Sequence, residues 1–154
     1  MDNIEFFKPK VSDIARMQKL VASEVENGNI LDRDPNEMAT TIRSYTAAKK
    51  DSEIIAFVAL HIHTDTLAEV RSLIVKEEYR KKGVATDLIK LVIEEAKHLE
   101  LQRLLVLTYK KSFFESFGFI EIPKESIPET KIWADCIKCK HFPICDEVSL
   151  ILDI

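Results

Sequence analysis

The sequence predicts a mixed α/β domain in which a long amphipathic helix joins two parallel strands. Apolar runs of strand length alternate along the chain with segments whose apolar residues recur at helical spacing. The run 68–75 is followed by a long helical pattern and then by the run 103–108, a strand–helix–strand order that needs parallel pairing and a right-handed crossover. Three glycines and five prolines in 154 residues indicate long elements and few linkers.

One strand and two helices are expected in the first third of the chain. Residues 4–8 predict the strand, and Ser12 is expected to cap the first helix. The apolar residues of that helix recur at helical spacing: Ile14, Met17, Val21 and Val25. The segment 34–37 reads D-P-N-E, with a capping Asp, a Pro at the first helical position and a Glu three residues after the cap. It predicts a second, short helix that ends near Arg43.

A hairpin and a third strand follow these helices. Residues 45–48 and 54–62 read as paired strands, joined by the polar stretch 49–53. A second turn at 64–66 leads to the strand 68–75. The chain thus has three strands in succession between the second helix and the long helix.

The rest of the chain predicts one long helix, a short helix and three strands. The long helix presents one apolar face: Ala85, Leu88, Ile89, Val92, Ala96 and Leu99. Residues 103–108 read as a buried strand, 113–117 as a short helix, and 119–122 and 148–153 as further strands. The resulting order of elements is typical of an α/β domain.

Composition excludes several classes of protein. The net charge of −4 argues against a general nucleic-acid binder, and no apolar run approaches the roughly 18 to 20 residues that span a bilayer. The first residues lack the basic and apolar regions of a signal peptide, so a cytoplasmic location is expected. Three cysteines, all in the last fifth of the chain, are an odd number that favours a reducing compartment.

The hexapeptide 80–85, R-K-K-G-V-A, lies between the strand 68–75 and the long helix. It brings a glycine and three cations to a helix start whose backbone N–H groups lack intrahelical partners. Such a turn can hold a phosphate group, with Gly83 allowing close approach of the backbone. Alone, the turn is equally compatible with a surface loop, and the glycine spacing excludes a Walker loop.

The residues around this turn resemble the GNAT acetyltransferases. The run 73–85, LIVKEEYRKKGVA, is similar to the family's strand followed by a [QR]-x-x-G-x-[GA] turn and a helix. The run 113–119, FFESFGF, resembles its second signature, an aromatic helix ending in Gly-Phe. The resemblance covers nearly the whole chain, residues 1–154, as one domain. It implies a mixed, mostly antiparallel sheet with a central pair of parallel strands that splay apart, flanked by helices.

The resemblance also implies acetyl-CoA as cosubstrate, bound where the two parallel strands separate. Main-chain groups of the strand would pair with the pantetheine, and the turn would hold the pyrophosphate. The implied cofactor-binding residues are Leu73, Ile74, Val75, Arg80, Lys81, Lys82, Gly83, Val84, Ala85, Thr86, Ser112 and Phe114.

A narrower resemblance is to the acetyltransferase domain of N-acetylglutamate synthases. It rests on the runs 59–61, 68–73, 105–108 and 113–119, and on a tail similar to that of short, single-domain relatives. The acceptor it implies is the α-amino group of L-glutamate, for arginine biosynthesis. The larger synthases carry an additional amino-acid-kinase domain, for which 154 residues leave no room, so arginine feedback through it is in doubt.

Glu69 is the predicted general base, because an amine nucleophile must lose a proton and a carboxylate beside the thioester can take it. The alternative is an ion pair with Arg71, two residues along the same strand face. Many GNAT enzymes place a tyrosine in the aromatic helix to protonate the leaving thiolate, and this chain has Phe114 there. Tyr109 and solvent are the replacement acids considered, with Ser112 close in sequence.

Leu31, Arg33 and Arg71 are the predicted substrate-binding residues. The run 30–33 resembles the segment that carries a basic substrate contact in the synthases, and guanidinium groups bind carboxylates with two parallel hydrogen bonds. A dicarboxylate such as glutamate suits two arginines. The alternative for each is a surface arginine.

The segment 129–147 contains C-x₂-C-x-H-x₃-C, formed by Cys136, Cys139, His141 and Cys145. Its spacing approaches that of zinc ligands but crowds them into ten residues, so reduced thiols are favoured over structural zinc. His61 and His63 share one strand face. A metal site there is also not favoured, and no metal ligand is assigned.

Together these observations predict an acetyl-CoA-dependent amino-acid N-acetyltransferase acting on a small amine, with L-glutamate favoured. The alternatives are a GNAT enzyme for another small amine or a protein N-terminus, and a non-catalytic acyl-CoA-binding sensor. Neither a nucleic-acid nor a membrane partner is expected. A homodimer is one of the oligomeric states that the sequence leaves open.

Overall fold

The computed structural model describes residues 3–27, 33–126 and 147–154, and the structural statements below concern these residues. The strands are β1 (Glu5–Phe7), β2 (Tyr45–Lys50), β3 (Glu53–Ile62), β4 (Leu67–Val75), β5 (Arg103–Thr108), β6 (Ile120–Ile122) and β7 (Val148–Asp153). The α-helices are α1 (Ile14–Glu26), α2 (Pro35–Thr40), α3 (Val84–His98) and α4 (Lys111–Glu115). Short 3-10 turns lie at Val11–Asp13, Ile42–Ser44, Glu77–Tyr79 and Lys124–Ser126.

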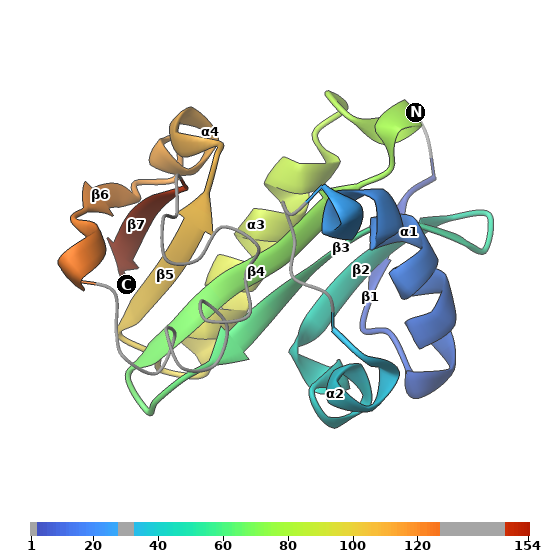
Figure 1. Ribbon diagram of the computed structural model, residues 1–154, viewed down its shortest axis with the longest axis horizontal. Helices are drawn as coiled ribbons and strands as arrows, with labels where there is room; N and C mark the ends of the chain where they lie inside the picture. The colour runs from blue at the N-terminus through green and yellow to red at the C-terminus, as the bar shows by residue number, and fades with distance from the viewer. Residues whose placement is uncertain (1–2, 28–32, 127–146) are drawn as a thin grey trace.

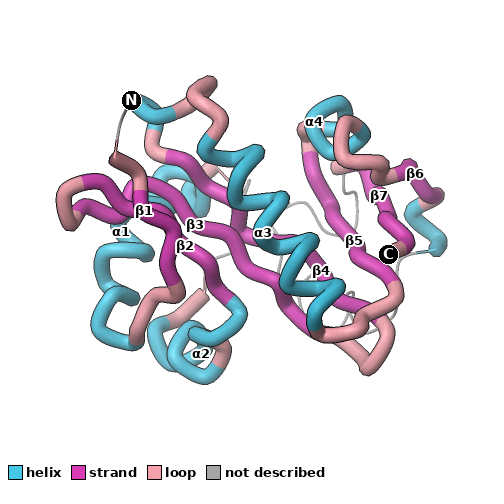
Figure 2. The backbone as a smooth tube through the Cα atoms, turned by 180° about the vertical axis from the view of Figure 1, so that it is seen from behind, coloured by secondary structure: helices cyan, strands magenta, loops and turns pink. Residues whose placement is uncertain are grey.

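The strands form one seven-stranded sheet in the order β1-β2-β3-β4-β5-β7-β6 (Figure 1). The described neighbours pair antiparallel except β4 and β5, which are parallel at the centre of the sheet. The prediction of a mixed, mostly antiparallel sheet with a central parallel pair is confirmed. α3 is the crossover between the parallel strands, and it lies along the sheet in Figure 2.

Helices cover both faces of the sheet. The apolar face of α3 packs on β2, β3 and β4 through the fully buried Leu88, Ile89 and Val92. α1 packs on the opposite face, where Met17 meets Phe57 in a second cluster. Because each fully buried side chain of this kind contributes about 1.5–3 kcal/mol, the two layers hold the central strands firmly.

Two turns near the start of the chain differ from the prediction. Ser12 is not the first helix cap, because a 3-10 turn begins at Val11 and the Lys10 backbone N–H donates to Asp13 Oδ2 at 2.8 Å. The hairpin turn has two residues, Asp51 and Ser52, instead of five, since β2 extends to Lys50 and β3 begins at Glu53. Both turn residues have positive φ, 50° and 73°, as in the two-residue turn that suits strand twist.

The short helices also differ at their ends. α2 ends at Thr40, and a 3-10 turn follows where the helix was expected to continue to Arg43. α4 begins at Lys111 and ends at Glu115, two residues before the predicted segment at each end. The cap of α2 is as predicted, with the Glu37 N–H donating to Asp34 Oδ1 at 2.8 Å.

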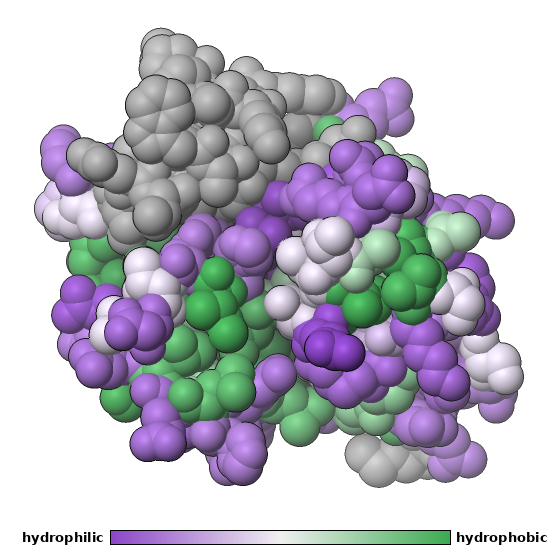
Figure 3. Space-filling model, turned by 90° about the horizontal axis from the view of Figure 1, so that it is seen from below, coloured by the Kyte–Doolittle hydropathy of each residue, from purple (hydrophilic) through white to green (hydrophobic). Residues whose placement is uncertain are grey.

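Exposed apolar side chains come from elements along the whole chain: Val11, Ile62, Leu91, Leu99, Tyr109 and Ile120. Figure 3 shows one face, on which apolar side chains occupy separate areas with hydrophilic side chains between them. Single exposed apolar residues are normal on a folded protein and are not evidence of a binding surface. None of the described helices combines the length and apolar character needed to cross a membrane.

Candidate functional site

The central feature of the site is the separation of β4 from β5. The parallel strands pair at only three positions, the last of which joins Glu69 to Leu105. Beyond this point they diverge (Figure 1), and a cleft of about 600 Å³ opens between them. Residues of both strands, of the turn before α3 and of α4 line this cleft.

A bulge in β4 changes the backbone at the wall of the cleft. Phe57 of β3 pairs with Ile74, whereas Ala59 pairs with Arg71, so two residues of β4 face one residue of β3. The extra residue interrupts the ladder of hydrogen bonds. Ser72 lies in this bulge with a φ of 60°, which is unusual for a residue with a Cβ. Residues of the bulge, Ser72 among them, line the cleft.

The turn before α3 forms the far end of the cleft. Gly83 is the N-cap, with a φ of 86°, and a Cβ built there would meet no atom within 4 Å. The space in front of this glycine is therefore open to a ligand. The first N–H groups of α3 lack intrahelical partners and carry the positive end of the helix dipole. Arg80 fixes the turn to the end of β4, donating from Nε to the Val75 carbonyl oxygen at 2.8 Å.

Ten of the twelve residues predicted to bind the cofactor line the cleft: Leu73, Ile74, Val75, Arg80, Lys81, Gly83, Val84, Ala85, Thr86 and Phe114. Lys82 and Ser112 are not among the lining residues. The Lys82 ammonium instead lies 5.6 Å from the centre of the Tyr79 ring, a cation–π distance. Tyr79 itself lines the cleft and was not predicted.

Aromatic packing fixes the wall that α4 contributes. The Phe114 ring is 3% exposed and meets Phe113 and Phe119 edge to face, at 5.1 Å and 5.5 Å between ring centres. Phe114 therefore supports the cleft from the core. Tyr109 lies in the loop between β5 and α4, lines the cleft and is 46% exposed, so its hydroxyl can exchange protons with solvent.

Glu69 is 2% exposed and lies at the last paired position of β4, next to the lining residue Val70, but is not itself among the residues that line the cleft. Its Oε1 is 2.9 Å from Nε2 of His63, which follows β3. This partner was not predicted, because the sequence analysis did not consider an interaction between either histidine and Glu69. The sequence signal that could have shown it is the turn 64–66, which returns the chain beside Glu69.

A second buried group lies on the same sheet face. Arg33 and Arg71 are 9% and 8% exposed, so neither is the surface arginine of the alternative interpretation. Both lie near Tyr45: burial raises the pKa of the Tyr45 hydroxyl, and the charges of Arg33 and Arg71 oppose this rise. Arg71 also lines the cleft, so this cluster adjoins the space between the splayed strands.

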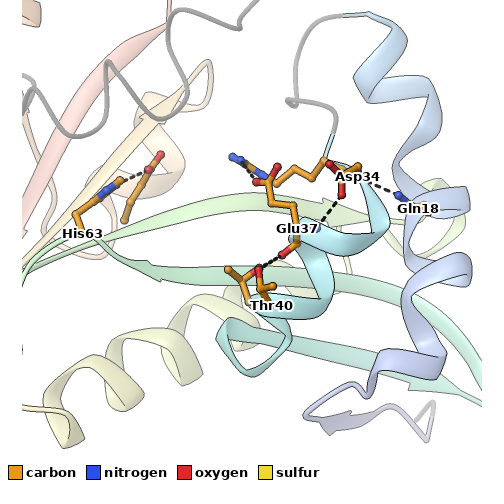
Figure 4. Close-up of polar contacts among 8 residues, drawn as sticks. Gln18, Asp34, Glu37, Thr40 and His63 are labelled. Atoms are coloured by element: carbon orange, nitrogen blue, oxygen red, sulfur yellow. Dashed lines mark hydrogen bonds and ion pairs between the residues drawn. The ribbon is translucent and has the colours of Figure 1, made fainter.

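The segment before α2 holds Arg33 in this position. Gln18 of α1 donates from Nε2 to the Arg33 carbonyl oxygen at 3.0 Å, and Asp34 caps the helix. Arg33 Nη1 lies 3.0 Å from Glu37 Oε2. In Figure 4, Glu37 and His63 extend over the same side of the sheet.

Some predictions fall on residues that the structure does not describe. Leu31 and the cluster Cys136, Cys139, His141 and Cys145 lie outside the described residues. Within residues 3–27, 33–126 and 147–154, no group of three or more His, Cys, Asp or Glu side chains is arranged to hold a metal ion. The cleft lining also includes residues that the sequence analysis did not single out, among them Thr108, Lys110 and Glu147.

Residues 11–119 match the profile of the acetyltransferase (GNAT) family. The chain belongs to this family. It is 31% identical over 146 residues to an uncharacterized N-acetyltransferase of Chlorobaculum tepidum, a match that spans 92% of this chain and 91% of that protein. It is 28% identical over 123 residues to the amino-acid acetyltransferase of Pasteurella multocida, spanning 79% of this chain but only 28% of that protein.

Solved structures share the GNAT fold. The N-acetylglutamate synthase of Neisseria gonorrhoeae, complexed with coenzyme A and N-acetyl-glutamate, superposes with a TM-score of 0.84 at 17% identity. That match covers 99% of this chain and 35% of the synthase. A Mycobacterium tuberculosis protein in complex with CoA gives 0.82 at 19% identity, covering 97% of this chain and 99% of that one. At these identities the likeness concerns the fold.

Proposed function

We propose that this chain transfers the acetyl group of acetyl-CoA to the α-amino group of L-glutamate. The observation that carries the proposal is that Arg71 lines the cleft and, together with Arg33, surrounds Tyr45 on one sheet face. A buried guanidinium group in the cleft wall and a second one nearby suit an acceptor with two carboxylates, although Arg33 does not itself line the cleft and pairs with Glu37. The names of similar proteins, amino-acid acetyltransferase and N-acetylglutamate synthase, point to the same class of acceptor.

The residues of the cleft fit acetyl-CoA. The open space at Gly83 and the N-terminus of α3 suit a pyrophosphate, with Lys81 adding positive charge beside it. The edge of β4 beyond Glu69 is not paired with β5, so its backbone can hydrogen-bond an extended amide chain such as pantetheine. In this proposal the thioester lies beside the bulge at Ser72, which lines the cleft.

The proposed chemistry is direct attack in a ternary complex. Glu69, or a water that it holds, takes a proton from the acceptor ammonium. The nitrogen lone pair then attacks the thioester carbonyl carbon, the C–N bond forms, and the C–S bond breaks as the negative charge returns from the carbonyl oxygen. Backbone N–H groups at the β4 bulge stabilise that charge. The nitrogen then loses its second proton to solvent to become the amide N–H. CoA leaves as a thiolate and receives a proton from solvent, either directly or through Tyr109, which solvent then reprotonates.

Thiol release with acetyl-CoA tests the proposal. The purified chain is assayed against L-glutamate, other amino acids, polyamines and a peptide N-terminus. Glutamate-dependent release above the rate without acceptor supports the proposal. Release that depends on a polyamine or peptide refutes glutamate as the acceptor and leaves the proposal of acetyl transfer intact. Tight CoA binding without turnover refutes the proposal that the chain is an enzyme.

Arg71→Gln separates the binding of the acceptor's carboxylate by Arg71 from the binding of the cofactor. We expect the KM for glutamate to rise about tenfold or more, because a charged hydrogen-bond donor contributes about 1.5–3 kcal/mol. The KM for acetyl-CoA should stay within twofold. Equal increases in both constants would show that Arg71 shapes the cleft instead of recognising the acceptor.

A further inference from the structure

The contact between His63 and Glu69 is a deeply buried pair of ionisable side chains. They are 3% and 2% exposed, and Nε2 and Oε1 are 2.9 Å apart. Burying a carboxylate and an imidazole together is costly unless each satisfies the other. The pair lies at the last paired residue of β4, where the cleft begins.

The surrounding structure holds the His63 ring in place. The ring of His61 meets it edge to face, with 4.8 Å between ring centres, and His61 is the cross-strand partner of Glu69. The backbone of His63 is fixed as well, because its N–H donates to the Leu67 carbonyl oxygen at 2.9 Å. Thr64 closes this turn by accepting the Leu67 N–H at 3.0 Å. The imidazole therefore has a defined position relative to the carboxylate.

Other ionisable groups share this sheet face. His61 projects from β3, and Arg71 projects from β4 two residues beyond Glu69. Glu37 extends over the same side from α2 (Figure 4). A hydrogen bond from a donor with a fixed position favours one orientation of a carboxylate. Nε2 of His63 has the geometry of that donor when it carries the proton.

We propose that His63 is a positioning residue that orients Glu69 toward the acceptor amine. This inference rests on the proposed function, in which Glu69 is the general base. His63 donates from Nε2 to Oε1, and the carboxylate held in this way accepts the proton of the acceptor. The arrangement is a base oriented by a third group, as in other catalytic sites. His63 itself makes no contact with the reacting atoms.

A pair of substitutions tests this role. His63→Gln retains an N–H donor on a side chain of similar reach, whereas His63→Leu retains bulk and removes the donor. We expect His63→Leu to lower kcat about tenfold to a hundredfold, the range of a hydrogen bond to a charged group. Both KM values should stay within twofold, and His63→Gln should recover most of kcat. His98→Gln, in the exposed last turn of α3, is the control histidine.

The outcomes distinguish this inference from the proposed function. Circular dichroism and thermal melting first establish that each variant is folded, and the assay uses whichever amine the wild type acetylates. Turnover with another amine instead of glutamate refutes the proposed acceptor, and the His63 variants still decide the positioning role. Unchanged kcat in folded His63→Leu, a loss confined to KM, or equal losses in both variants overturns it. A wild type that acetylates no amine refutes both proposals.

Discussion

Gly83 is the residue whose substitution separates stability from cofactor binding most cleanly. Its φ of 86° lies in the left-handed region, and a Cβ there would contact nothing within 4 Å. Gly83→Ala therefore costs only the backbone preference, about 1–2 kcal/mol. For a domain of this size that corresponds to a fall of roughly 2–8 °C in Tm.

The effect on CoA is expected to be larger than the effect on folding. The methyl group that Gly83→Ala adds would occupy the open space in which we place the pyrophosphate. It would keep the phosphate oxygens from the N–H groups at the start of α3, which are charge-assisted donors worth about 1.5–3 kcal/mol. We expect the Kd for CoA, measured by isothermal titration calorimetry, to rise about tenfold to a hundredfold.

Gly118 supplies the matched control. It also has a positive φ, 99°, and a Cβ there would lie 3.4 Å from Leu152 Cδ1, an ordinary contact. Gly118 is not among the residues that line the cleft. Gly118→Ala should therefore lose a similar amount of stability and bind CoA like the wild type. If Gly83→Ala melts like Gly118→Ala and also binds CoA with the wild-type Kd, the pyrophosphate is not at this turn.

Three further substitutions test the acceptor end. Glu69→Gln should lower kcat about a hundredfold or more at saturating substrates, the usual contribution of a general base, and an unchanged kcat would exclude that role. Glu37→Gln removes the carboxylate 3.0 Å from Arg33, so the KM for glutamate should fall roughly two- to fivefold while that for acetyl-CoA is constant. Burial raises the pKa of Tyr45, so the folded state keeps this phenol protonated after the unfolded chain ionises, and stability falls as pH rises above about 10. Tyr45→Phe should lack this part of the loss of stability at alkaline pH. The measurement is Tm between about pH 9 and 11, the range around the ordinary phenol pKa.

Most elements could be predicted from the sequence because local signals agreed with tertiary packing. The strands at 103–108 and 148–153 have the predicted bounds, since both are short apolar runs flanked by polar residues. The hairpin turn was missed because Asp51 and Ser52 adopt positive φ without a glycine to indicate it. The 3-10 turns at helix ends were also missed. A 3-10 turn differs from an α-helix only in which carbonyl each backbone N–H bonds, and no residue type marks that difference in the sequence.

The two ends of the cleft differ in how far the sequence predicts them. The cofactor end is formed largely by one contiguous segment around Arg80 and Gly83, so a motif can represent it. The acceptor end is assembled by strand register and helix packing from segments far apart in the chain. Tyr45 lies near Arg71 because β2, β3 and β4 align, and near Arg33 because the segment before α2 packs beside these strands. No linear pattern contains that alignment, and the contact of His63 with Glu69 depends on it too.

The spacing along β4 gives a physical reason to expect a small acceptor. Glu69 and Arg71 project to the same face, two residues apart, which is about 6.6–6.8 Å along a strand. A carboxylate held at Arg71 would therefore place an amine near Glu69 if both groups belong to one short molecule. An amino acid carries both a carboxylate and an amine, whereas a polyamine has no anionic group for the arginine. β4, which leaves β5 beyond Glu69, would thus set the distance between the arginine that binds the carboxylate and the glutamate that takes the proton.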